Sequence, residues 1–142
     1  MACDTSVYSL LDHTADLKIR VCGKDLLDLF ENAATAMMGF LVEAGPADET
    51  EAIPVSLTAE DLNDLMVRWL SEILYLLMGE HQVVVRSKLN AIDRSHLDAV
   101  LHVIPYDPDR HSIETEIKAV TYHQIDVSPR GSHWQAEIVF DL

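Results

Sequence analysis

The chain has 142 residues, of which 49% are hydrophobic, and this length is typical of one globular domain that buries about two-thirds of its unfolded surface. Its 24 Asp and Glu residues outnumber its 10 Lys and Arg residues, which gives a formal net charge of -14. Such a charge disfavours unaided binding to nucleic acid or to an anionic membrane, because phosphate affinity comes largely from basic side chains. A cation or a basic protein is the partner that this charge favours.

The first residues carry neither the basic segment nor the apolar segment of a secretory signal, and no uninterrupted apolar run is long enough to span a membrane. We therefore expect a cytoplasmic protein. The two cysteines, Cys3 and Cys22, are too few and too far apart for a zinc site or a redox pair. In a reducing compartment we expect them to be free thiols.

A dense cluster of polar chemistry follows the first predicted strand, 7–11. Asp12-His13-Thr14-Ala15-Asp16 places two carboxylates and an imidazole in five residues. From Asp16 onward polar and apolar residues alternate, which predicts a half-buried strand over 16–22 with Asp16 on its solvent-facing side. The cluster is either a charged turn whose side chains bond the local backbone, or part of a functional site.

Apolar residues recur at spacings of three and four over 24–41, which predicts an amphipathic helix with one apolar stripe. Residues 43–51 contain Gly45-Pro46 and no large apolar side chain, so we predict an acidic loop there. No Lys or Arg lies between Lys24 and Arg68, and this part of the chain is expected to carry a negative face.

A short strand over 53–57 is predicted to lead into a second helix that ends at Gly79. Thr58 followed three residues later by Asp61 resembles a capping box, which would begin this helix. Its apolar positions cover more than one stripe, so we expect the second helix to be the more deeply buried of the two.

The remaining third of the chain is predicted to form four strands joined by polar turns, and an antiparallel meander fits their spacing: 83–92, 96–105, 116–127 and 133–140. In the last of them Trp134 and Phe140 share the inward parity, which makes Asp141 surface-directed. The predicted fold class is α+β, an antiparallel β-sheet domain of about six to seven strands with two amphipathic helices. We expect it to form a single domain over 1–142.

A search for catalytic motifs is negative. The sequence has no phosphate-binding glycine motif, no His-Glu-x-x-His and no nucleophile elbow. Its seven histidines show no close pair at the spacing of metal ligands, and Asp107-Pro108-Asp109 lacks the Gly and Glu of a calcium loop. Residue patterns alone therefore give an acidic α+β domain without an assigned role.

Three separated motifs, read together, resemble the archease family. They are Asp12-His13-Thr14-Ala15-Asp16, Ile117-Lys118-Ala119-Val120-Thr121-Tyr122-His123 and Phe140-Asp141-Leu142. The Lys-Ala-Val-Thr-Tyr-His string is the most specific single element, and the resemblance covers the whole chain. It implies an antiparallel α+β fold with two helices, which agrees with the elements predicted above.

The resemblance implies a function without catalysis by this chain: activation of the RtcB-type RNA ligase, which joins 2′,3′-cyclic-phosphate or 3′-phosphate ends to 5′-hydroxyl ends in tRNA splicing and RNA repair. An archease-like protein would promote guanylylation of that ligase and its multiple turnover. Neither direct nucleic-acid binding nor membrane binding is expected. Two alternatives stay open: a modulator or chaperone of a tRNA-modifying methyltransferase, and a metal-dependent hydrolase that uses Asp12, His13 and Asp16.

The resemblance also implies a divalent-metal site at Asp16, Asp141 and Leu142, and no catalytic residue. Oxygen ligands of this kind suit Ca²⁺ best, with Mn²⁺ or Mg²⁺ as alternatives. Lys118 and His123 are the expected partner-binding residues. In the simpler interpretation the ion only ties the last strand to the second one, Lys118 is a solvated strand lysine, and His123 is a structural histidine.

Overall fold

The structure is a computed structural model that describes residues 6–9, 16–45, 47 and 49–142. The predicted Asp12 and His13 of the hydrolase alternative lie outside these ranges. The described elements, in chain order, are β1 (Ser6–Ser9), β2 (Asp16–Gly23), α1 (Leu26–Leu41), β3 (Val42–Glu43), β4 (Glu51–Thr58), α2 (Leu62–Met78), β5 (Gln82–Ile92), β6 (His96–Pro105), β7 (Ser112–Ile113), β8 (Ala119–Val120), β9 (Asp126–Arg130) and β10 (His133–Asp141).

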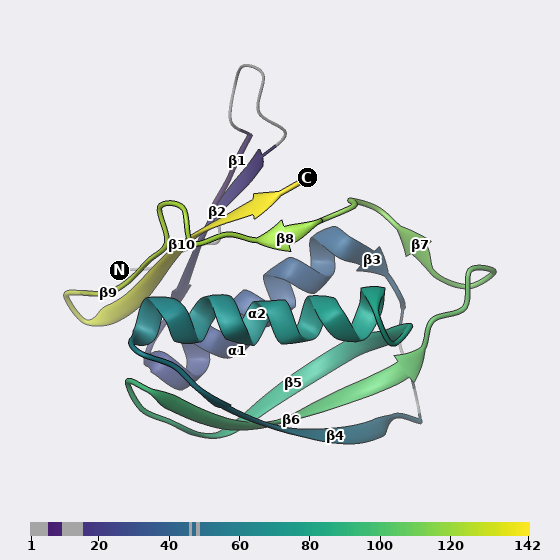
Figure 1. Ribbon diagram of the computed structural model, residues 1–142, viewed down its shortest axis with the longest axis horizontal. Coiled ribbons are helices and arrows are strands. Elements are labelled where there is room, and N and C mark those ends of the chain that lie inside the picture. Colours follow the sequence, from purple (N-terminus) through teal and green to yellow (C-terminus); the bar gives the residue numbers. More distant parts are fainter. Residues whose placement is uncertain (1–5, 10–15, 46, 48) are drawn as a thin grey trace.

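The strands form three antiparallel sheets. The largest has the order β1-β2-β10-β8, with β9 also paired to β10, and the others have the orders β4-β6-β5 and β3-β7. Figure 1 shows both helices between the sheet that contains β2 and β10 and the sheet that contains β5 and β6. The α+β class is therefore confirmed. The described residues hold ten strands, more than the predicted six to seven, because β3, β7 and β8 are two-residue pairings too short for a periodicity to reveal.

The predicted meander of the last four strands is wrong. The β5–β6 pair belongs to one sheet, whereas β9 and β10 pair in another, next to β2. Alternation along a strand tells which side chains share a face, but not which strand lies beside it. The predicted strand 116–127 is also interrupted, because a turn with Gln124 at a φ of 58° separates β8 from β9.

Two aspartates cap the start of helix α1. The N-cap Asp25 accepts the backbone N–H of Asp28 (2.8 Å), and the Asp28 carboxylate accepts the backbone N–H of Lys24 (2.9 Å). Two N–H groups that the helix itself cannot satisfy are thereby bonded. We call this arrangement an Asp-x-x-Asp box.

Helix α2 begins with the same box. Asp61 is its N-cap and accepts the N–H of Asp64 (2.8 Å), while the Asp64 carboxylate accepts the N–H of Glu60 (3.0 Å). The predicted capping role of Thr58 is wrong, because Thr58 is the last residue of β4 and pairs with His96. The chain leaves the β4 sheet only after Thr58, so the helix cannot begin before Asp61.

The two helices share one apolar core. Ten residues of α2 and six of α1 are buried, which confirms that α2 is the more deeply buried helix. The indole N–H of Trp69, fully buried, donates to the carbonyl oxygen of Phe30 at 2.9 Å and so joins α2 to α1. In the described part of the chain, neither helix is long and apolar enough to cross a membrane.

Strand β5 is an edge strand of its sheet, and α1 lies beside it. The carboxylate of Glu31, on α1, accepts the backbone N–H of Leu89, on β5, at 2.8 Å. One outward backbone donor of the edge is therefore paired with a side chain and not with another strand.

The prediction of free thiols is wrong for Cys22, which is disulfide-bonded. Its partner lies outside the described residues. The spacing of the cysteines along the sequence did not suggest a disulfide, because spacing does not show which strands are neighbours. In the structure β1 and β2 are antiparallel, with Ser6 opposite Arg20, two residues from Cys22.

Candidate functional site at the end of β10

The structure brings Asp16 and Asp141 together. They are direct partners in the antiparallel pairing of β2 and β10, so their side chains leave the sheet on the same face. Direct cross-strand partners have Cβ atoms about 4.5–5.5 Å apart, and like charges in that position destabilise a sheet. A cation bound between the two carboxylates would remove this repulsion.

Strand β8 fixes the other side of Asp141. Ala119 is its cross-strand partner there, and the backbone N–H of Lys118 donates to the carbonyl oxygen of Asp141 at 2.7 Å. Leu142 is half-buried and packs against the core. The end of β10 is therefore held between β2 and β8, while the Lys118 side chain remains exposed.

The donor set predicted here would consist only of oxygen atoms, from the carboxylates of Asp16 and Asp141 and from Leu142. Such a set fits a hard cation and not zinc. Among the described residues no group of three or more His, Cys, Asp or Glu side chains is placed to hold a metal. A site here therefore depends on the oxygens of Leu142 in addition to the two side chains.

Basic residues on the same face are already engaged. Lys18 and Arg20 alternate with Asp16 along β2, and their side chains contact the Glu137 carboxylate at 3.0 and 3.1 Å. The hydrogen bond from Lys18, followed by that from Arg20, holds the pKa of Glu137 below its usual value against the effect of burial. Glu137, and not the Asp16 and Asp141 pair, is thus the observed partner of both cations.

A second constellation, which the sequence pattern did not predict, links the Lys-Ala-Val-Thr-Tyr-His string to α2. The hydroxyl of Tyr122 donates to the Asp64 carboxylate at 2.7 Å, and Arg68 Nε donates to the other oxygen of that carboxylate at 3.0 Å. Tyr122 belongs to the Lys-Ala-Val-Thr-Tyr-His string, so the family motif did indicate that this residue is of interest. Nothing in the sequence indicated that its partner lies 58 residues away.

These contacts shift the titration of both groups. The hydrogen bond from Tyr122, and then the one from the Glu60 backbone, lower the pKa of Asp64 below 3.8. The same bond to Asp64 raises the pKa of Tyr122 above 10.0. Around neutral pH the carboxylate is therefore ionised and the phenol is protonated, which is the combination that the hydrogen bond requires.

His123 follows Tyr122 in the turn after β8, and its side chain is exposed. Among the described residues its imidazole has no hydrogen-bond partner. The simpler interpretation of His123 as a structural histidine is therefore not favoured. Its expected contact with a partner stays a prediction.

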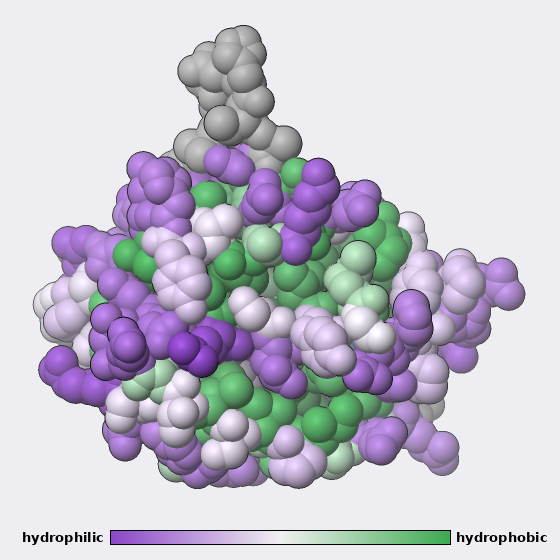
Figure 2. All heavy atoms as spheres, in the orientation of Figure 1, coloured by the Kyte–Doolittle hydropathy of each residue, from purple (hydrophilic) through white to green (hydrophobic). Residues whose placement is uncertain are grey.

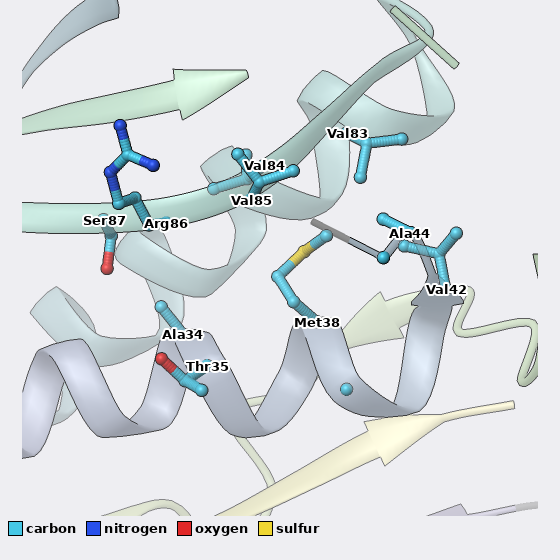
Figure 3. Close-up of a pocket in the computed structure, with 12 residues that line it drawn as sticks. Ala34, Thr35, Met38, Val42, Ala44, Val83, Val84, Val85, Arg86 and Ser87 are labelled. Atoms are coloured by element: carbon cyan, nitrogen blue, oxygen red, sulfur yellow. The ribbon is translucent and has the colours of Figure 1, made fainter. Parts of the chain in front are cut away.

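The groove between α1 and β5 offers little chemistry (Figure 3). Met38 of α1 points toward the valines of β5, and the cavity has a volume of about 220 Å³. Arg86 is the single charged residue among its described lining residues. An apolar groove without converging polar groups does not resemble a catalytic site.

The fold and the fixed end of β10 define a class: an acidic, antiparallel α+β protein with two helices and an aspartate pair at a sheet corner. A model of the Archease protein family (MTH1598/TM1083) matches residues 8–142. The protein archease of Methanosarcina acetivorans is 38% identical over 139 residues, which cover 95% of each chain. That of Methanopyrus kandleri is 33% identical, with 93% of this chain and 96% of the relative covered. The chain belongs to the archease family.

Solved structures agree with this assignment. The solution structure of Methanobacterium thermoautotrophicum protein 1598 matches with a TM-score of 0.77 and 28% identity, covering 97% of this chain and 98% of that one. A crystal structure from Thermotoga maritima, described as an archease and possible chaperone, matches with a TM-score of 0.64. At 19% identity over 95% of this chain and 97% of that one, it supports the fold alone.

Proposed function

We propose that this protein is a non-enzymatic activator of an RtcB-type RNA ligase, which promotes guanylylation of the ligase and its multiple turnover. Membership of the archease family supports the proposal. The observation that carries it is the direct pairing of Asp16 with Asp141, because an activator that presents a cation needs a fixed pair of carboxylates on its surface. The net charge of -14 favours docking on a basic ligase surface and disfavours holding RNA.

In this proposal a divalent cation binds to Asp16, Asp141 and Leu142. Ca²⁺ takes about six to eight oxygen ligands, so three residues would leave positions for water or for a group of the partner. Ca²⁺ suits this donor set best, and Mn²⁺ or Mg²⁺ would suit it too. The cation would supply positive charge at the contact with the ligase, while the pairing of β10 with β2 and β8 holds the carboxylates in position.

Lys118 and His123 are the proposed contacts with the ligase. Both are exposed. They lie in the segment 118–123, which contacts the end of β10 through the Lys118 backbone and the first turn of α2 through Tyr122. A cationic side chain cannot be a metal ligand, so the role of Lys118 is separable from that of the aspartates.

A multiple-turnover ligation assay tests the proposal. The ligase is supplied with RNA ends in excess, and its product is measured with and without this protein. We expect added protein to raise turnover, and Asp16→Asn and Asp141→Asn to remove both this effect and Ca²⁺ or Mn²⁺ binding measured by calorimetry. Lys118→Ala should impair turnover with unchanged metal binding.

Asp109→Asn is the matched control, because Asp109 is an exposed aspartate in a turn outside the proposed site. Full activation by both site variants would contradict the proposed site. Absence of any effect of the wild-type protein on turnover would contradict the function itself. Hydrolysis of phosphoesters by the purified protein without a partner would instead support the hydrolase alternative.

A further inference from the structure

Helix α2 leaves one narrow stripe of its surface uncovered, although ten of its seventeen residues are buried. We call it the outer stripe, and it consists of the less buried positions Asp64, Arg68, Ser71, Glu72, Tyr75 and Met78. They recur at spacings of three and four, so they share one side of the helix. In Figure 1 α2 lies in front of α1, and Figure 2 shows hydrophobic areas among hydrophilic ones on this face of the molecule.

Two exposed tyrosines are fixed at the two ends of the outer stripe. Tyr75 is 54% exposed and donates its hydroxyl to Glu80 at 2.9 Å. Tyr122 is 58% exposed and donates its hydroxyl to Asp64 at 2.7 Å. A ring that is already held at its hydroxyl loses little further freedom when a partner covers it, which is favourable for recognition.

Gly79 provides a place for the ring of Tyr75. A Cβ atom on Gly79 would lie 2.6 Å from Tyr75 Cε1 and 2.9 Å from Tyr75 Cδ1, so the ring lies directly against the glycine. The backbone of Gly79 has a φ of -96°, which any residue adopts. The same Cβ atom would lie 3.0 Å from the backbone oxygen of Tyr75, so the glycine makes room for the ring and also for the last turn of α2.

The charge around the tyrosines is negative. Glu72 and Glu80 flank Tyr75, and Glu60 and Asp61 precede Asp64 at the other end. Arg68 is the single basic residue of the outer stripe, and it is paired with Asp64. Lys and Arg side chains bind the faces of aromatic rings. Lys or Arg side chains of a partner placed over these two tyrosines would also lie close to the surrounding carboxylates.

We infer that the outer stripe, together with Tyr122, is a docking surface for a protein that inserts Lys or Arg side chains over the two rings. The partner is a basic protein surface, which complements the charge of the stripe. The inference rests on the proposed function for the identity of that partner, the RNA ligase, and adds the face on which it docks.

The test measures binding of the ligase to variants of the full chain. Replacing Tyr75 and Tyr122 together by serine removes both rings, and we expect about tenfold weaker binding. Gly79→Ala displaces the Tyr75 ring without removing it and should weaken binding by about threefold. Glu51→Gln and Ile113→Ala are matched controls that remove an exposed charge and an exposed apolar side chain outside the stripe, and they should bind as the wild type does.

Binding that the tyrosine double variant retains in full would overturn the inference, provided that its circular dichroism and thermal unfolding match the wild type. If that variant fails to fold, Gly79→Ala and a Glu72→Gln/Glu80→Gln double variant decide, and wild-type binding by both would overturn it. Weaker binding by the controls to the same extent would also overturn it, since the loss would then not be specific to the stripe.

A second measurement works without the ligase and separates this inference from the proposed function. An arginine-containing peptide is titrated into the labelled protein, and the ring signals of the tyrosines are followed by NMR. We expect the signals of Tyr75 and Tyr122 to shift, those of the half-buried Tyr106 to stay, and a peptide with glutamine in place of arginine to have no effect. Equal shifts at all three rings, or none, would overturn the docking surface even if the ligase is activated.

Discussion

The two helices begin with the same four-residue device and use it differently. Asp25 with Asp28 on α1, and Asp61 with Asp64 on α2, form boxes whose N-cap hydrogen bonds are both 2.8 Å long. On α1 the box serves the helix alone. On α2 the last residue of the box, Asp64, also accepts hydrogen bonds from Tyr122 and Arg68.

The residue four positions after each box shows why the uses differ. On α1 this residue is Asn32, whose side-chain amide donates to the carbonyl oxygen of Cys22 at 2.9 Å and so faces β2. On α2 it is Arg68, which is exposed and turns back to Asp64. The start of α1 is thus joined to the sheet behind it, whereas the start of α2 organises a surface. One capping motif can therefore be structural in one helix and position an exposed side chain in another.

The largest difference between the boxes is expected at their last aspartates, Asp28 and Asp64. Asp64→Ala removes one capping bond, the Arg68 contact and the Tyr122 contact, and we expect it to lower the free energy of unfolding by about 2 kcal/mol. Asp28→Ala removes only a capping bond and should cost about 1 kcal/mol. Denaturant unfolding at neutral pH measures both. Equal costs would mean that the Tyr122 and Arg68 contacts add no stability.

The N-cap positions should behave alike. Asp25→Ala and Asp61→Ala each remove one hydrogen bond to the N–H three residues ahead, and each should cost about 1 kcal/mol. Thermal unfolding of the two variants, with the corresponding Ser replacements as conservative controls, gives the comparison. A cost confined to one helix would show that the two boxes are not equivalent caps.

Tyr122→Phe isolates one contact of Asp64 and should cost about 0.5 kcal/mol at neutral pH. Because the folded state holds the pKa of Asp64 below 3.8, its stabilising contribution is complete above that value and is lost as the pH falls through the lower folded pKa. The hydrogen bond from Tyr122 is the largest cause of that lowering. The stability difference between wild type and variant should therefore shrink at acid pH, which unfolding curves between about pH 2 and about pH 7 would reveal. A difference that is independent of pH would contradict the assignment.

The smallest effect is expected for Arg68→Gln. The contact with Asp64 joins residues four apart on an exposed helix face, and such pairs add little to stability. Any loss of stability should vanish in high salt, because the contact is exposed to the solvent. Asn32→Ala on α1 makes the useful contrast, since its hydrogen bond to β2 is partly buried and should respond little to salt.

The boxes also show where prediction from the sequence succeeds. The apolar stripes at spacings of three and four located both helices, and α1 begins at Leu26, within two residues of the prediction. Capping was harder, because Thr58 and Asp61 match a capping box as well as Asp61 and Asp64 do. Thr58 pairs within β4, and this long-range pairing with β6 decides against the local signal.

The candidate site also depends on pairing between strands that are far apart in the sequence. Family resemblance selected Asp16, Asp141 and Lys118, and the structure brings the first two into register and bonds the backbone of the third to Asp141. Periodicity could place Asp16 and Asp141 on solvent-facing sides of their strands, but not next to each other. The contact between Tyr122 and Asp64 was missed for the same reason, since neither residue signals the other within its own segment.

The bond between Glu31 and Leu89 has a consequence for the behaviour of the protein in concentrated solution. An edge strand with free backbone donors is a template on which the edge of another molecule can pair, and this leads to aggregation. The Glu31 carboxylate already occupies one such donor of β5. Removal of that carboxylate by Glu31→Ala would open the edge, and we expect the variant to self-associate as its concentration rises, which light scattering would detect. A helix side chain would then help to keep this strand from pairing with copies of the protein.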